Sequence, residues 1–246
     1  MQKYVEIFGE QDTRQIFPTL NSGEIHIWSA SFSGSPLFVT LCRQCLSDVE
    51  IQRLSFYEFE EAKNNYLMSQ GGLKILLSLY LHLPSDQVKI GRHTKGKPFS
   101  LDDKQLYFNI SNSGDQVVFA FSKSGEVGID IEEIRPLIEL DELIEKNFSQ
   151  KEREYIDASL SDRLERFFKF WTVKESYLKA IGEGMRLTPD NLEFTIEKND
   201  FKLQGVKGFF EHQDRISKSF DAGQKYHGTL TYLGEATKVE KTFILK

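Results

Sequence analysis

Hydrophobic and polar residues follow two different periods in the first half of this chain. Residues 24–32 alternate apolar and polar side chains at every second position, which predicts a half-buried strand. Residues 47–57 begin with a serine of the kind that caps helices and predict a helix. From residue 60 to residue 83 the apolar stripe has helical spacing, although Gly71 and Gly72 interrupt it. A glycine pair inside a helix indicates that another segment approaches the backbone closely there.

Strand-like and helix-like patterns continue beyond residue 100. Residues 105–111 and 116–122 predict two strands. The turn residues 123–126 predict a hairpin that returns along a third strand, residues 127–134. Residues 140–160 have the spacing of a helix.

The last third of the chain adds a helix and further strands. We expect a helix over residues 162–181 and a hairpin over residues 191–205 that turns at Asn199 and Asp200. The segments QKYHGTLTYLG and VEKTFILK predict more strands. The order strand, helices, strands, helices, strands favours an α+β fold with two lobes over a parallel sheet of repeated βαβ units.

Composition narrows the class of protein and its partners. The chain has 246 residues, of which 39% are hydrophobic and 28% charged, as in a soluble globular protein. A net charge of −6 argues against nucleic acid as a partner. We find no apolar run of about 18 residues and no apolar core of a signal peptide, so we expect a cytoplasmic protein without a membrane partner. Cys42 and Cys45 stand alone as a C-x-x-C pair, and we expect incidental reduced thiols.

Two carboxylates share one face of the strand that includes GIDIE. Side chains at i and i+2 of a strand point to the same side, so Asp130 and Glu132 project together while Ile129 and Ile131 face a core. Two adjacent like charges repel unless a cation lies between them, and oxygen ligands suit Mg²⁺. A solvated acidic face on an acidic protein is the alternative interpretation.

A third carboxylate lies on the helix predicted over residues 162–181. Glu175 and Lys179 are four residues apart and share a helix face, so they form either a simple ion pair or a functional pair. In the functional interpretation Glu175 is a third metal ligand and Lys179 contacts a phosphate. Gly182 and Gly184 follow, either to let a ligand approach the backbone or to cap the helix.

A basic turn precedes these elements. Gly91 to Lys97 reads G-x-x-x-x-G-K, but Pro98 replaces the magnesium-binding Ser or Thr of a P-loop, so we reject that motif. What is left is a turn in which Lys95 and Lys97 either face an anion or are merely exposed. The five histidines show no metal-ligand spacing.

Several blocks together match a known family. VGIDIE, followed about forty residues later by FWTVKESYLKAIGEG, resembles the two signature blocks of the Sfp-type 4′-phosphopantetheinyl transferases, G-[IV]-D-[IV]-E and [FW]-[ST]-x-K-E-[AS]-x-x-K. GKP at 96–98 and FNIS at 108–111 are similar to two upstream blocks of that family. The resemblance covers roughly residues 45–190.

The resemblance implies a fold and a reaction. It implies two similar α+β lobes that form a pseudo-dimer, each an antiparallel sheet packed with helices, which we place at residues 1–122 and 123–246. Coenzyme A and Mg²⁺ would bind in the cleft between them. The family transfers the 4′-phosphopantetheine group of coenzyme A to a serine of an apo acyl or peptidyl carrier protein and releases adenosine 3′,5′-bisphosphate. The lobed members typically act as monomers.

The resemblance also implies roles for particular residues. The metal ligands would be Asp130, Glu132 and Glu175. The catalytic residues would be Glu175, as the base that activates the serine, and Lys179, which contacts the pyrophosphate; a metal-bound water is the alternative base. Further coenzyme A contacts would be Arg53, Lys74, Lys97, Ser111 and Asn112.

The chain departs from the family pattern in its basic residues. Asn112 stands where the family commonly has His, so we expect a weaker hold on a coenzyme A phosphate. Lys74 stands in the place of an Arg, and Arg53 is a further candidate for a nucleotide contact. A non-catalytic protein that binds coenzyme A or a carrier is therefore the main alternative, and a magnesium-dependent hydrolase is a weaker one. For a carrier we expect a basic or apolar docking face.

Overall fold

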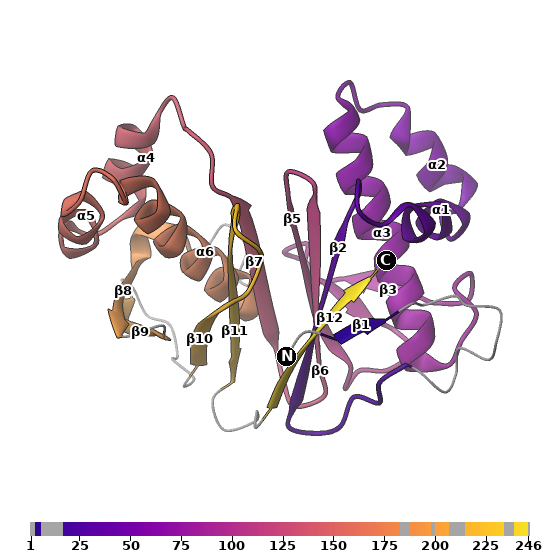
Figure 1. Cartoon of the computed structure of the whole chain (residues 1–246). Coiled ribbons are helices and arrows are strands. Elements are labelled where there is room, and N and C mark those ends of the chain that lie inside the picture. Colours follow the sequence, from indigo (N-terminus) through magenta and orange to yellow (C-terminus); the bar gives the residue numbers. More distant parts are fainter. Residues whose placement is uncertain are drawn as a thin grey trace.

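The protein is arranged in four layers: helices, a sheet, a second sheet, and further helices (Figure 1). The computed structural model describes residues 3–5, 17–182, 187–197, 200–206, 215–233 and 239–245. In that part of the chain, no helix is both long and apolar enough to cross a membrane. Cys42 and Cys45 are free thiols.

The first sheet has both the N-terminal and the C-terminal strand of the chain. Its order is β1 (Lys3–Val5), β12 (Val239–Leu245), β2 (Glu24–Ser31), β6 (Gln116–Ser122) and β5 (Tyr107–Ser113). Helices α1 (Pro36–Gln44), α2 (Asp48–Leu54) and α3 (Glu60–Leu81) cover its outer face (Figure 1). The last strand, β12, pairs in parallel with both β1 and β2, so the end of the chain returns to the first lobe.

The second sheet is antiparallel and belongs to the other lobe. Its order is β7 (Val127–Glu133), β11 (Tyr226–Leu233), β10 (Arg215–Phe220), β9 (Asp200–Val206) and β8 (Leu192–Glu197). Helices α4 (Leu140–Asn147), α5 (Gln150–Asp157) and α6 (Arg163–Ile181) cover it, and a short 3₁₀ turn, η3 (Pro189–Asn191), precedes β8. A small separate hairpin consists of β3 (Ile90–Arg92) and β4 (Pro98–Ser100).

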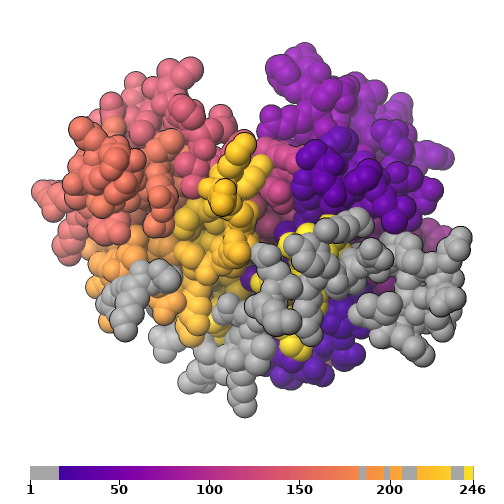
Figure 2. All heavy atoms as spheres, viewed as in Figure 1, coloured from indigo at the N-terminus to yellow at the C-terminus, as the bar shows by residue number. Residues whose placement is uncertain are grey.

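The two sheets pack face to face through apolar side chains. The shared cluster joins both sheets and includes Ile25, Ile27, Val118 and Ala120 from the first and Val127, Ile129, Ile131 and Leu230 from the second. Ile129 and Ile131 thus face a core, as the alternation in GIDIE predicts. In the space-filling view the molecule is hollowed at one end, between α4 and the helices of the first lobe (Figure 2).

The α+β prediction is confirmed, and several local predictions are confirmed with it. Ser47 caps α2 and accepts a hydrogen bond from the Glu50 amide, while Glu50 reaches back to Ser47. The glycine pair in α3 has the expected close neighbour, because a Cβ at Gly71 would lie 2.3 Å from the Cys42 carbonyl oxygen. Gly182 caps α6 in the left-handed conformation. The division at residue 122 stays a prediction.

Two predictions about elements are wrong. Residues 123–126 do not join a hairpin, because β6 pairs with β2 and β5 whereas β7 pairs with β11 in the other sheet. The turn instead carries the chain from one lobe to the other. The helix predicted over 140–160 is two helices, because Ser149 begins a new capping box at α5. Asn199 and Gly184 lie outside the described residues.

Candidate active site

A polar seam joins the edge strands of the two sheets. Side chains of β5 at every second position contact β7: the Ile129 amide donates to Asn109 Oδ1 at 3.0 Å, and Ser111 Oγ donates to Asp130 Oδ1 at 2.8 Å. Ser113 Oγ, two residues on, donates to Glu132 Oε2 at 2.7 Å. The period of two in β5 therefore places an alternating row of polar side chains along the acidic strand.

Gly128 lets α6 cross β7 at close range. A Cβ on this glycine would lie 2.0 Å from the Ser176 carbonyl oxygen and 2.4 Å from the Ala180 amide nitrogen. Ser176 and Ala180 are small and fully buried, so the helix and strand backbones touch. The glycine of one signature block thus fits between two small residues of the other. This contact sets how far the helix side chains reach over β7.

Lys179 brings the two blocks together. Its Nζ donates to Asp130 Oδ1 at 2.7 Å and to Ser111 Oγ at 2.9 Å. Asp130 is buried, whereas the Lys179 side chain is 30% exposed. The ammonium therefore neutralises a buried carboxylate on one side and faces open space on the other. The ion pair shown for Lys179 is with Asp130 of the other signature block, and the phosphate contact of Lys179 stays a prediction.

A pocket of about 450 Å³ opens beside this centre. Glu175 and Lys179 line it from the second lobe, and Lys97, Asn109 and Ile110 line it from the first. The rest of its wall comes from Lys95, Pro98, Leu178, Gly182, Leu187, Thr188 and Pro189. The pocket therefore lies between the lobes, as the resemblance implies.

Comparisons with known proteins agree with this geometry. Residues 126–231 match the family model of the 4′-phosphopantetheinyl transferase superfamily, and residues 30–124 match the model of the N-terminal region of such transferases. The 4′-phosphopantetheinyl transferase HetI of Nostoc sp. is 31% identical over 171 residues, which cover 68% of this chain and 72% of HetI. The chain belongs to the 4′-phosphopantetheinyl transferase superfamily.

Other superfamily members match over a smaller share of their length. The 4′-phosphopantetheinyl transferase gsp of Aneurinibacillus migulanus is 39% identical over 59% of this chain and 60% of its own. L-aminoadipate-semialdehyde dehydrogenase-phosphopantetheinyl transferase of Xenopus laevis is 29% identical over 63% of this chain. This chain spans only 56% of the Xenopus protein.

The pKa values of all three acidic residues of the signature blocks are raised, in each case first by burial. Burial raises the pKa of Glu175, and the negative charges of Asp130 and Glu132 raise it further. Burial and the charge of Asp130 likewise raise the pKa of Glu132, against the hydrogen bond from Ser113. Burial raises the pKa of Asp130, and the Lys179 ammonium opposes that rise. The three carboxylates are thus close enough to interact electrostatically.

The donor set fits a hard divalent cation. Asp130 Oδ2 is buried and has no hydrogen-bond partner, so one carboxylate oxygen is available as a ligand. Among the described residues, no three acidic, histidine or cysteine side chains form a group that could hold a metal by themselves. Mg²⁺ is commonly held by one or two carboxylates with water and substrate phosphates in its other positions, so such a partial set suits it. That Glu175 shares the ion with the strand pair stays a prediction.

The predicted coenzyme A contacts fall into two groups. Asn112 lines a second pocket of about 210 Å³, which shares Asn109 with the first, and its Nδ2 donates to Ser69 Oγ at 3.0 Å. Arg53 lies over the Tyr66 ring, 5.5 Å from the centroid. Lys74 forms an ion pair with Glu50. The described linings of these two pockets include neither Arg53 nor Lys74.

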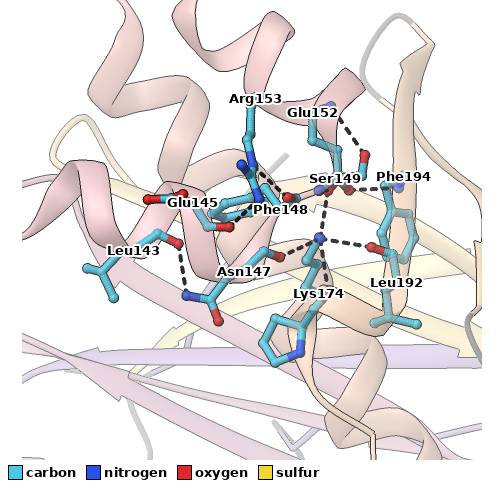
Figure 3. Close-up of polar contacts among 11 residues, drawn as sticks. Leu143, Glu145, Asn147, Phe148, Ser149, Glu152, Arg153, Lys174, Leu192 and Phe194 are labelled. Carbon is cyan, nitrogen blue, oxygen red and sulfur yellow. Dashed lines mark hydrogen bonds and ion pairs between the residues drawn. The ribbon is translucent and has the colours of Figure 1, made fainter.

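The first lysine of the helix signature faces away from the pocket. Lys174 is fully buried, and its Nζ donates to Glu152 Oε2 at 2.7 Å (Figure 3). It also donates to the carbonyl oxygens of Asn147, Pro189 and Leu192, so its three N–H groups are shared among four acceptors. Lys174 therefore ties α6 to the start of α5 and to the segment that forms one wall of the pocket. The pattern of the sequence shows a lysine beside aromatic residues but does not reveal this cage.

Sequence reasoning also missed Asn109, Ser113 and the role of Gly128. The signal for the first two is present, because they stand two positions either side of Ser111 in the same strand. For Gly128 the signal is a glycine inside an otherwise apolar strand, which indicates close approach of another backbone.

Proposed function

We propose that this protein is a Mg²⁺-dependent transferase that moves the 4′-phosphopantetheine group of coenzyme A to a serine of an apo carrier protein. The observation that carries this proposal is the contact between the two signature blocks. Lys179, Ser111 and Asp130 form one hydrogen-bonded centre beside a pocket lined by both lobes. An acidic pair of which Asp130 is buried, next to a fixed ammonium, suits the binding of a diphosphate through a cation.

The proposed reaction is a displacement at phosphorus. The serine oxygen of the carrier forms a bond to the phosphorus that bears the pantetheine arm, and the bond from this phosphorus to the bridging oxygen breaks. Adenosine 3′,5′-bisphosphate leaves with that oxygen. Such transfers depend on positioning and on neutralising charge more than on covalent help.

The chain's own residues supply the proton transfer and part of the charge. Glu175 lines the pocket, and its raised pKa makes it a stronger base for the serine proton, directly or through a water. Lys179 places a positive charge where negative charge develops on the diphosphate. Asp130 and Glu132, with Glu175, would hold Mg²⁺, which when bound would withdraw charge from the diphosphate.

Exposed apolar side chains are available for a carrier protein. Phe56 and Phe59, between α2 and α3, are 77% and 73% exposed, and Ile138, just before α4, is fully exposed. These positions support the predicted apolar docking face, although Glu58 and Glu60 beside them are exposed as well. Docking there stays a prediction, as do the identity of the carrier, a cytoplasmic location and a monomeric state.

A direct assay tests the function. The protein is incubated with coenzyme A, Mg²⁺ and a panel of apo acyl and peptidyl carrier proteins, and each carrier is weighed by mass spectrometry. We expect a mass gain of one phosphopantetheine and a loss of transfer of more than about 100-fold in Asp130→Ala. Glu133→Gln, the next carboxylate on β7, is the matched control, and circular dichroism checks that both variants fold.

The alternatives give different results in the same assay. Coenzyme A binding with no mass gain on any carrier would favour a non-catalytic binding protein. Breakdown of coenzyme A without a carrier would favour a hydrolase. Transfer by Asp130→Ala at the wild-type rate would refute the metal-binding role of that residue.

A further inference from the structure

Lys97 belongs to the GKP block and lines the pocket, which by resemblance makes it a phosphate contact. We propose instead that Lys97 is a positioning residue that clamps the end of α6 and the start of β7 to the β3–β4 hairpin. The consequence for catalysis rests on the proposed function, but the clamp itself does not.

The hydrogen bonds of Lys97 carry the argument. Its Nζ donates to Glu126 Oε2 at 2.5 Å, to the Ala180 carbonyl oxygen at 3.0 Å and to the Val127 carbonyl oxygen at 3.2 Å. An ammonium has three N–H donors and no more. Three acceptors within the protein match these three donors one for one. A phosphate would have to displace one of them or share a donor with it.

Burial and the helix terminus add to this arrangement. The Lys97 side chain is only 9% exposed, and burial lowers its pKa while Glu126 opposes that change. Ala180 lies in the last turn of α6, where carbonyl groups have no partner within the helix. A cation at this end also interacts favourably with the helix dipole. Lys97 thus satisfies a helix end that the fold would otherwise leave open.

The glycine that caps α6 makes room for the lysine. Gly182 has a positive φ of 70°, and a Cβ there would lie 3.1 Å from Lys97 Cδ. The stem of Lys97 therefore crosses the helix end at a point where a side chain would crowd it. Gly182 in AIGEG and Lys97 in GKP therefore pack against each other, although they are 85 positions apart in the sequence.

The clamp acts on the active site through the helix backbone. Ala180, whose carbonyl Lys97 holds, directly follows Lys179, whose ammonium meets Asp130. The same ammonium of Lys97 holds Val127, three residues before Asp130 on β7. One side chain from the first lobe thus fixes both second-lobe elements that form the ion pair. Loss of the Lys97 ammonium should therefore disturb the orientation of Lys179 more than it weakens the binding of any one coenzyme A phosphate.

Two variants separate a clamp from a phosphate contact. Lys97→Met removes the ammonium, and Glu126→Gln weakens the clamp while leaving the lysine free for a ligand. If Lys97 clamps, both variants lower kcat in carrier modification, Lys97→Met by about 10- to 100-fold, and the double variant is no worse than Lys97→Met. The loss is the same with coenzyme A and with dephospho-coenzyme A. Lys104→Met, a nearby exposed lysine, is the charge control.

Hydrogen exchange provides a readout that does not depend on transfer. Both clamp variants should lose amide protection in residues 178–182, and the control should keep it. Two results together would refute the clamp. The amide protection of residues 178–182 would be unchanged in both variants. The KM for coenzyme A would rise in Lys97→Met, with kcat unchanged, and would stay equal or fall in Glu126→Gln. If the wild type transfers nothing, the proposed function fails, and the exchange result still decides the clamp.

Discussion

Two lysines on the same helix have opposite surroundings. Lys174 is fully buried among one carboxylate and three carbonyl oxygens, and it lies 4.7 Å from the centre of the Phe148 ring. Lys179 is 30% exposed, pairs with Asp130 and lines the pocket. At 3.6 residues per turn, five positions turn a side chain by about 140°. The two therefore point to different faces of α6.

The difference separates a structural part of the helix signature from the part that faces the pocket. The carboxylate and carbonyl partners of Lys174 lie within the second lobe, from α4 to β8, so this lysine stabilises the elements that surround the site. Lys179 reaches across to β5 of the first lobe through Ser111. Glu175, beside Lys174 in sequence, shares the Lys179 side and lines the same pocket. One helix therefore carries a buried structural face and a second face that lines the pocket, here called the reactive face because of the proposed roles of Glu175 and Lys179.

Reciprocal methionine variants give the sharpest test of this contrast. Lys179→Met should reduce transfer by more than about 100-fold, because it removes a preorganised charge at the diphosphate. Lys174→Met should instead lower the free energy of unfolding by about 3–5 kcal/mol, because it leaves Glu152 as an unpaired buried charge. Urea unfolding and the carrier assay are run on both variants.

The contrast would fail if both variants lost the same stability and the same activity. Should Lys174→Met not fold, the double variant with Glu152→Met removes both buried charges and is expected to recover stability. If the double variant recovers stability but not the KM for coenzyme A, the stabilising role of Lys174 is still distinguished from its effect on the pocket. The KM for coenzyme A reports on the pocket wall, since Lys174 holds the Pro189 carbonyl oxygen.

Mg²⁺ should stabilise the protein against unfolding through the carboxylates near Lys179, and this effect should depend on pH. Without metal, the raised pKa of Glu175 means that the folded state binds a proton more readily than the unfolded chain. The contribution of this carboxyl to stability is therefore most favourable at low pH, and it is lost as pH rises from the ordinary value of 4.5 through the raised value. Mg²⁺ at 100 times its dissociation constant should then add about 2.7 kcal/mol at neutral pH.

Urea unfolding at pH 4.5 and pH 7.5, with and without Mg²⁺, checks this expectation. Glu175→Gln should be more stable than the wild type at the higher pH without metal, and the difference should shrink at the lower pH. The Mg²⁺ effect should be smaller in Asp130→Asn and unchanged in Glu133→Gln. An equal Mg²⁺ effect in all variants would place the cation elsewhere.

Gly128→Ala should alter the reactive face by moving α6 relative to β7. The added methyl group meets the Ser176 carbonyl oxygen, a backbone atom that cannot rotate away, so α6 must shift. Such overpacking typically costs about 1–3 kcal/mol. We expect a lower unfolding midpoint together with a loss of kcat, because the shift moves Lys179 relative to Asp130. Gly205→Ala, where a Cβ has open space, is the control.

The sequence predicts those parts of the site that depend on local periodicity. The period of two in GIDIE places Asp130 beside Glu132 and sends Ile129 into the core, and the structure agrees on the core. The resemblance places Ser111 and Lys179 at the same site, and they meet there. What the sequence leaves open is which distant segments supply the partners.

Three cases show why those partners are not predictable. The turn at 123–126 reverses the chain, but the residues of a turn do not decide which strand β7 pairs with. Its partner is β11, which lies nearly a hundred residues further along the chain. Strand β12 pairs in parallel with β2 of the first sheet, and no local pattern in the sequence encodes this pairing. The acceptors of Lys97 are mostly carbonyl oxygens, which every residue has, so composition does not identify them.

The smallest expected effect lies beyond the reactive face, in the second pocket. Asn112 replaces the histidine that its family block commonly has, and its amide donates to Ser69. Asn112→His would put a group that can carry charge at that wall, and a charge-assisted hydrogen bond is roughly twice as strong as a neutral one. We expect the KM for coenzyme A to fall by about twofold to fivefold below pH 6.5, where histidine is largely protonated, with kcat unchanged. Asn112 is in the described lining of the second pocket and not in that of the first, so a change in kcat would mean that the second pocket and the reactive face are not separate. Ser69→Ala would then show whether the lost Ser69 contact is the cause.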